Sequence, residues 1–219
     1  MLSALRRWYP GCSFRMDGGP IMRPGETHKR PHGPENAEYE LRKAYNCIVE
    51  AGVTHLWNRR PIPDVDPEEV LALYNRAFDA YRKGERLAAE RWSRTAKHLA
   101  RAFWHEAKIA YLEPHEAEIP YLAGGTAEEY NLHEHSDTTA DLLDSLSMDV
   151  PSGHGQIPAP MLQYLTRARK HLKKLEEKGY KHELLRAERI KAAHEYGRTV
   201  ECMALAYEAD ATGKKTSAA

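Results

Sequence analysis

The stretch from residue 67 to residue 112 constrains the fold most, because its apolar residues repeat at helical spacing on both sides of Gly84. They recur every three or four positions in each half, with charged residues mostly between them. Asp66 and Pro67 provide an N-cap and a first helical residue, and Gly84 ends the first helix. Because the connection is so short, we expect two long helices packed antiparallel as a hairpin. The residues expected at the centre of the core are Leu73, Ala77, Trp92, Ala96, Leu99 and Phe103.

The rest of the chain predicts further helices separated by glycine and proline. One helix is expected from about residue 35 to Gly52, and a weaker one over residues 126–148. A second antiparallel hairpin is expected over residues 161–210, after a Pro/Gly-rich linker at residues 150–160. No segment alternates like a strand over four or more residues. The sequence therefore predicts an all-α fold, a bundle of five or six helices built from antiparallel helical hairpins.

The two ends of the chain differ from the predicted bundle in composition. Residues 1–34 contain ten prolines and glycines and carry six basic against two acidic residues. This composition predicts a flexible basic N-terminal arm. Residues 35–149 are expected to form a helical domain around the central hairpin. Residues 211–219 are small and polar, and we expect them to be a frayed tail.

Charge is distributed unevenly along the chain, although the formal net charge is zero. Residues 101–150 hold eleven acids and two bases, whereas residues 151–219 hold thirteen bases and eight acids. Opposite charges of this kind can pair within one chain or between two copies in a homodimer. Basic side chains on a helical hairpin can also follow a phosphate backbone. The residues expected to form such a partner or nucleic-acid surface are Arg167, Lys170, Lys174 and Lys181.

The acidic part of the chain also contains histidines, and the two together are potential metal ligands. Helical bundles that bind two metal ions carry carboxylates and imidazoles on facing helices, with a Glu-x-x-His step on two of them. That step is not met here, and a solvated acidic face is the alternative interpretation. The candidate metal ligands are His105, Glu106, Glu129, His133 and His135.

The central hairpin has residues that are typical of a known repeat. Tyr81, Gly84, Ala89 and Ala96 stand where tetratricopeptide repeats keep a ring, a turn glycine and two small packing residues. Residues 70–97 therefore resemble a single tetratricopeptide repeat. The resemblance implies a helical hairpin that binds other proteins, although arrays of this family contain several copies.

The same hairpin is also similar to the HEPN group of helical domains, through Ala89, Ala96 and residues 99–102. Many members of that group cut RNA with an Arg-x4-His motif, and Arg189 and His194 have this spacing. The resemblance implies that Arg189 would hold the scissile phosphate and that His194 would move a proton.

Several other classes of protein lack support in the sequence. It contains no P-loop, no GxGxxG and no GxSxG motif, so we expect no cofactor. No apolar run reaches the roughly 18 residues that span a bilayer, and the first residues do not resemble a secretory signal. Three distant cysteines argue against a disulfide framework. We therefore expect a cytoplasmic protein that does not contact the membrane.

The function favoured by these observations is a non-enzymatic helical scaffold or adapter that binds another protein. Two alternatives stay open from the sequence. One is a HEPN-like domain that binds or cuts RNA, with Arg189 and His194 as its catalytic residues. The other is a metal-binding helical bundle.

Overall fold

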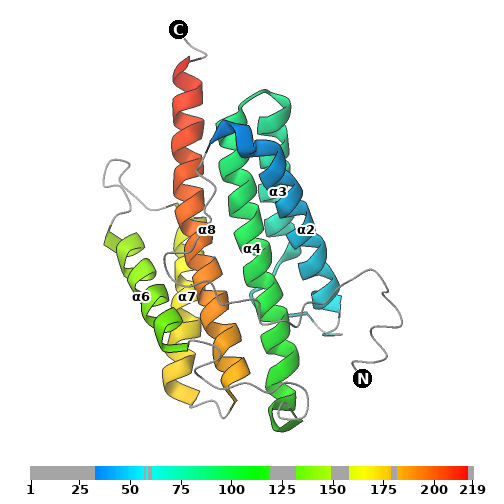
Figure 1. Ribbon diagram of the computed structural model, residues 1–219, viewed down its shortest axis with the longest axis vertical. Helices are drawn as coiled ribbons and strands as arrows, with labels where there is room; N and C mark the ends of the chain where they lie inside the picture. Colours follow the sequence, from blue (N-terminus) through cyan, green and yellow to red (C-terminus); the bar gives the residue numbers. More distant parts are fainter. Residues whose placement is uncertain are drawn as a thin grey trace. The chain divides into compact units, whose positions relative to one another are not determined.

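Helix α4 (Arg86–Leu112) contacts more of the fold than any other helix in the computed structural model (Figure 1). It packs against α8 (Glu183–Thr216) along most of its length. It also packs against α2 (Ala37–Leu56) and α3 (Pro67–Arg82), which contact each other. The predicted hairpin of α3 and α4 is therefore present, but α8 and α2 cover more of α4 than α3 does.

The two remaining α-helices among the described residues contact α8. Both α7 (Ala159–Lys178) and α6 (Leu132–Met148) pack against it, and α7 with α8 forms the predicted second hairpin. Two short 3-10 helices, η1 (Pro34–Asn36) and η2 (Glu113–Glu118), precede α2 and follow α4. Because α4, α6 and α7 all contact α8, that helix is buried on several sides.

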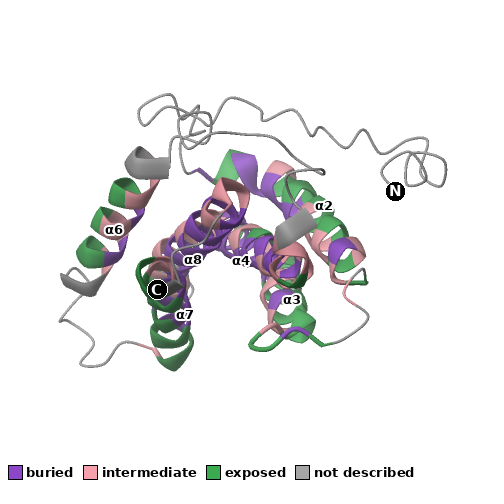
Figure 2. Cartoon of the chain, turned by 90° about the horizontal axis from the view of Figure 1, so that it is seen from below, coloured by how far each residue is buried: buried purple, intermediate pink, exposed green. Residues whose placement is uncertain are grey.

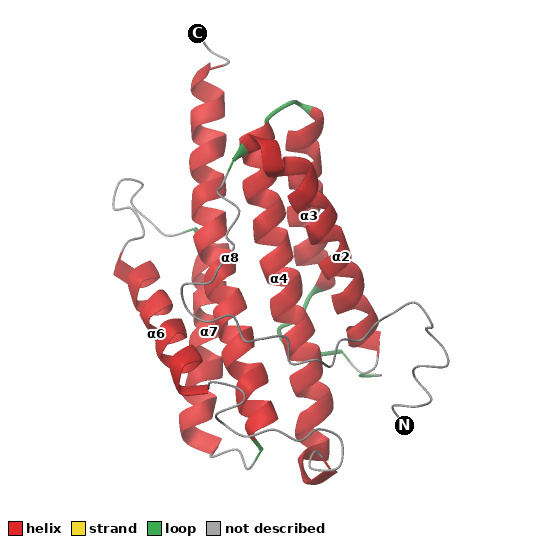
Figure 3. Ribbon diagram, in the orientation of Figure 1, coloured by secondary structure: helices red, strands yellow, loops and turns green. Residues whose placement is uncertain are grey.

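The structure describes residues 33–56, 58, 61–118, 132–148, 158–178 and 182–216. Every regular element in these ranges is helical (Figure 3), and six of them are α-helices. The predicted all-α bundle of five or six helices is thus confirmed. Most of the predicted arm at residues 1–34 and of the linker at residues 150–160 lies outside the described residues.

Local chemistry accounts for the ends of α3. The Asp66 carboxylate accepts a hydrogen bond from the Glu68 backbone N–H at 3.0 Å, which makes Asp66 the predicted N-cap. Gly84 has a φ of +82°, a left-handed conformation that glycine adopts without steric cost. These two residues fix where the helix starts and where the chain turns towards α4.

Other predicted helix ends were wrong. Gly52 does not end its helix, because α2 continues to Leu56. A glycine inside a helix costs about 1 kcal/mol relative to alanine but does not by itself stop the helix. The buried Thr54 donates its hydroxyl to the Glu50 carbonyl one turn earlier. At the other end of the chain, α8 extends to Thr216, beyond the predicted limit at residue 210.

The core lies along α4 and α8, where buried residues gather (Figure 2). Trp92, Leu99 and Phe103 on α4 are buried with Tyr196 and Val200 on α8. Five of the six predicted central residues are buried: Ala77, Trp92, Ala96, Leu99 and Phe103. The sixth, Leu73, is only half-buried at the edge of this core.

Trp92 ties three helices together. Its indole N–H donates to the Asp210 carboxylate on α8, 3.2 Å away, and its ring meets Tyr207 edge to face. The Arg76 guanidinium of α3 lies 3.9 Å from the centre of the Trp92 ring and forms an ion pair with Asp210. Trp92 therefore holds α3 and α8 against α4.

One glycine permits a close approach between helices. A Cβ atom at Gly197 of α8 would lie 3.0 Å from a Leu142 methyl group and 3.2 Å from one of Leu143, both on α6. Gly197 thus lets α6 lie close to α8. No described helix is both long and apolar enough to cross a bilayer.

Replacing Trp92 by alanine is expected to destabilise the fold by roughly 3 to 5 kcal/mol, because it leaves a cavity and removes the partner of Asp210 and Arg76. For a chain of this size the melting temperature should fall by about 10 °C. Leu162→Ala, at an exposed position of α7, is the control and should leave the melting temperature almost unchanged. Thermal unfolding followed by circular dichroism measures both. Equal melting temperatures for the two variants would contradict this account of the core.

Candidate functional site

Hydrogen-bonded histidine–glutamate pairs lie inside the interface between α4 and α8. His98 Nδ1 is 2.6 Å from a Glu195 carboxylate oxygen, and His105 Nδ1 is 2.6 Å from one of Glu188. All four residues are almost fully buried, and the two pairs are seven residues apart on each helix. Arg101 and Lys108, also on α4, contact the second oxygens of Glu195 and Glu188 at 3.2 and 3.3 Å. Each buried carboxylate therefore has a histidine and a permanent cation as partners.

Burial sets the protonation states of these pairs. It lowers the pKa of His98 to about 4 and also lowers the pKa of His105, in spite of the neighbouring carboxylates. Burial alone would raise the pKa of Glu188, but His105 and Lys108 outweigh it and hold that pKa well below its ordinary value. At neutral pH each neutral imidazole thus donates its Nδ1–H to an ionised carboxylate.

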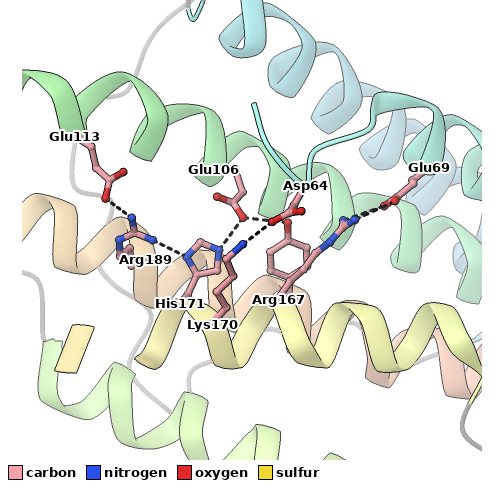
Figure 4. Close-up of polar contacts among 9 residues, drawn as sticks. Asp64, Glu69, Glu106, Glu113, Arg167, Lys170, His171 and Arg189 are labelled. Carbon is pink, nitrogen blue, oxygen red and sulfur yellow. Dashed lines mark hydrogen bonds and ion pairs between the residues drawn. The ribbon is translucent and has the colours of Figure 1, made fainter. Parts of the chain in front are cut away.

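A chain of polar contacts runs from Glu113 on η2 through Arg189 on α8 and His171 on α7 to Glu106 on α4 (Figure 4). Arg189 donates to the Glu113 carboxylate and, at 3.2 Å, to His171 Nδ1. Because a guanidinium can only donate, His171 Nδ1 must be an acceptor, which places the imidazole proton on Nε2. His171 Nε2 then donates to Glu106, 2.7 Å away, and the Tyr196 hydroxyl donates to the same Glu106 oxygen. Both ring nitrogens of His171 are therefore occupied.

Two further pairs connect α7 to the segment around α3. Arg167 donates two hydrogen bonds to the Glu69 carboxylate, at 3.0 and 3.1 Å. This bidentate geometry is the strong form of an arginine–carboxylate contact. Lys170 donates to Asp64 at 2.6 Å, and Asp64 has a left-handed φ of 63°, which is uncommon for a residue other than glycine.

These groups line a pocket of about 150 Å³ between α4, α7, α8 and the connector that precedes α3. Apolar contacts from Ile62, Pro63 and Ile109 form part of its wall. The ionisable residues of the lining are Asp64, Glu106, Glu113, Arg167, Lys170, His171, Lys174 and Arg189. We refer to this feature as the α7 pocket.

The predicted basic surface is largely the wall of this pocket. Arg167 is only 9% exposed, and Lys170 and Lys174 line the α7 pocket. Lys181 lies outside the described residues. Arg167 donates instead to Glu69. Because Glu69 lies 98 positions earlier in the sequence, local spacing could not predict this contact.

Arg189 and His194 are not brought together. Residues five apart on an α-helix point about 140° away from each other, because each residue turns the helix by about 100°. Arg189 is directed to Glu113 and His171, and neither contact involves His194. Burial lowers the pKa of His194 to about 4. Their catalytic role stays a prediction.

The candidate metal ligands have other partners where they are described. His105 binds Glu188, and Glu106 accepts from His171 and Tyr196. Glu129 and the side chain of His133 lie outside the described residues, while His135 is half-buried on α6. Within the described ranges, no group of three or more histidine, cysteine or acidic side chains is placed to hold a metal ion.

The structure exposes a set of apolar side chains on α2 and α3. Tyr45 and Val49 of α2, and Phe78 of α3, belong to the apolar stripes of their helices, but all three are exposed. They share their helices with two further exposed apolar residues, Leu56 and Leu71. The apolar stripes of α2 and α3 are wider than the contact with α4 can cover. We call this set of five residues the α2–α3 face.

Comparison of the chain with protein-family models, curated proteins and solved structures found no match. The resemblances to tetratricopeptide repeats and to HEPN domains therefore stay predictions.

The stability of the fold is expected to fall as the pH drops from about 6.5 towards 4. In this range the unfolded chain protonates His98 while the folded chain, with a pKa of about 4, does not. The free energy of unfolding should therefore decrease by up to about 1.4 kcal/mol per pH unit for each such histidine. Urea unfolding at several pH values measures this slope.

His98→Gln should make this pH dependence shallower, because glutamine can still donate to Glu195 but does not titrate. The same pH dependence in the variant and in the natural protein would contradict the assignment of a neutral, buried His98.

Proposed function

We propose that the protein is a non-enzymatic helical scaffold that binds another protein through the α2–α3 face. The observation that supports this proposal is the exposure of large apolar side chains on two adjoining helices. Tyr45 is 56% exposed and Phe78 is 45% exposed. Neighbouring apolar groups on a protein surface are typical of interaction sites, whereas scattered ones are not.

The spacing of these residues fits one continuous strip. Tyr45, Val49 and Leu56 are four and seven residues apart, which places them on one side of α2. Leu71 and Phe78 are seven residues apart on α3. The Tyr45 and Tyr74 rings meet with centroids 6.3 Å apart, so the two helices adjoin at this level.

An amphipathic helix of a partner is the occupant that we propose for this strip. Two adjoining helices leave a shallow groove, and a third helix fills such a groove with apolar residues three and four positions apart. Exposed charged residues flank the strip on α2, where Arg42 and Glu38 form an i, i+4 pair. Such a rim can orient a partner helix of complementary charge.

The acidic and basic segments of the chain give less support for a partner-binding surface than the α2–α3 face does. The acidic and basic segments that were expected to attract partners are paired within the chain, through His171 with Glu106 and Arg189 with Glu113. A homodimer held by those charges stays a prediction. The five side chains of the α2–α3 face are apolar and take no part in this pairing.

We also propose that the protein acts in the cytoplasm. Cys202 is buried and Cys47 half-buried, both as free thiols. Free thiols persist in a reducing compartment. Burial raises the pKa of Cys202 to about 12, so this thiol is unreactive at neutral pH.

The double variant Tyr45→Glu, Phe78→Glu should lose the partner, because two charges would then be buried against the apolar side of a helix. Both positions are exposed, so the folded state should keep most of its stability. Capture from a native lysate, compared by mass spectrometry, measures the loss.

Leu162→Glu is the matched control, since Leu162 is an exposed leucine on α7, outside the α2–α3 face. This variant should capture the same proteins as the natural chain. If the double variant also captures the same proteins, the α2–α3 face is not the binding surface.

A further inference from the structure

We propose that the α7 pocket binds a small phosphate-bearing ligand, a phosphomonoester or inorganic phosphate. This site is separate from the α2–α3 face and does not depend on the scaffold function. Its volume of about 150 Å³ is roughly ten times the ~10–15 Å³ that admits one water molecule. The pocket therefore has room for a phosphate group with a short organic substituent.

The charge of the lining favours an anion. Four permanent cations line the pocket, namely Arg167, Lys170, Lys174 and Arg189, and the carboxylates of Asp64, Glu106 and Glu113 oppose them. Glu106 already accepts hydrogen bonds from His171 and Tyr196. The lining itself holds one more cation than carboxylate, but Arg167 is already paired with Glu69 outside the lining, so an anion gains a cation of the pocket by displacing a carboxylate.

The deep arginine is fixed in position. Arg189 is only 1% exposed, and one of its terminal nitrogens donates to His171, which is itself held by Glu106. A guanidinium held in one plane presents several N–H donors in fixed directions, which suits recognition of phosphate and carboxylate. Little conformational entropy remains to be lost when a ligand binds.

Two carboxylates of this chain already contact cations of the pocket, at the positions where the oxygens of a bound phosphate would lie. Glu113 contacts Arg189, and Asp64 contacts Lys170 at 2.6 Å. Both carboxylates are partly open to solvent, with side chains 30% and 49% exposed. The Lys170–Asp64 pair is exposed on both sides and is therefore weak, whereas in the Arg189–Glu113 pair only the carboxylate is open to solvent. A phosphate dianion can therefore replace these two single charges at the cations of the pocket.

The burial of the arginines limits the size of the ligand. A nucleic-acid backbone would have to reach Arg189 and Arg167, which are 1% and 9% exposed. The extended polymer cannot enter a pocket of this volume. The predicted nucleic-acid surface is thus better explained as the wall of a site for a small phosphate compound.

Calorimetric titration of the full chain at low ionic strength tests the proposal, with inorganic phosphate and glycerol 2-phosphate as the two probes. We expect saturable binding of at least one probe at a single site, and the stronger one identifies the source of the phosphate group. Lys170→Ala should weaken binding roughly three- to tenfold, because it removes an exposed cation at the rim. Lys173→Ala is the matched control. Lys173 lies three residues after Lys170 on α7, pairs with Glu177 and does not line the pocket.

Glu113→Gln separates a binding site from a purely structural network. The substitution removes the charge that competes for Arg189, so both probes should bind more tightly than to the natural chain. The far-ultraviolet circular dichroism of each variant checks that it is folded.

Three results would overturn the proposal. The first is no binding of either probe at millimolar concentration by both the natural chain and the folded Glu113→Gln variant. The second is an equal loss for Lys170→Ala and Lys173→Ala, which would indicate non-specific attraction. The third is an RNA oligonucleotide that binds more tightly than both probes and is weakened by Lys170→Ala, which would indicate a polymer site.

Discussion

The pairing of charges inside the interface of α4 and α8 is the constraint on which the rest of the structure depends. Removing one partner of a buried pair leaves an unpaired charge and costs several kcal/mol. A slip of α8 along α4 by one turn would separate both His98 from Glu195 and His105 from Glu188. The apolar residues of the two helices would tolerate such a slip far better, because alanines are common among them. These buried pairs thus select one register, and α6 and α7 are positioned by α8.

The same register brings the α7 pocket together. Arg189 follows Glu188 in the sequence, so the contact of Glu188 with α4 directs the next side chain towards α7 and η2. Structural pairing and the candidate ligand site are therefore built from adjacent residues of one helix. The α2–α3 face lies outside these contacts, since α2 meets α4 through apolar side chains and through a separate buried pairing of Glu40 with Arg94 and Lys97. The two proposed sites use different elements and can be tested separately.

Periodicity in the sequence was sufficient to predict the helices and most of the core, because spacing within one helix is a local property. Trp92 and Phe103 were predicted as buried for this reason. Periodicity does not tell how much of a stripe a neighbouring helix will cover, so the exposure of Phe78, which belongs to the apolar stripe of α3, could not be predicted from spacing. Contacts between distant segments were also out of reach. Glu188, for example, is buried against His105, 83 positions earlier.

The close contact at Gly197 has a consequence for how the bundle opens. Helix α6 is attached mainly through Leu142 and Leu143, which rest where a side chain at position 197 would stand, and it makes few contacts with α7. The α4–α8 interface, in contrast, combines apolar burial with paired charges over several turns. Among the described helices, we therefore expect α6 to have the lowest free energy of local unfolding. Its amide hydrogens should exchange with solvent while those of α4 and α8 are still protected.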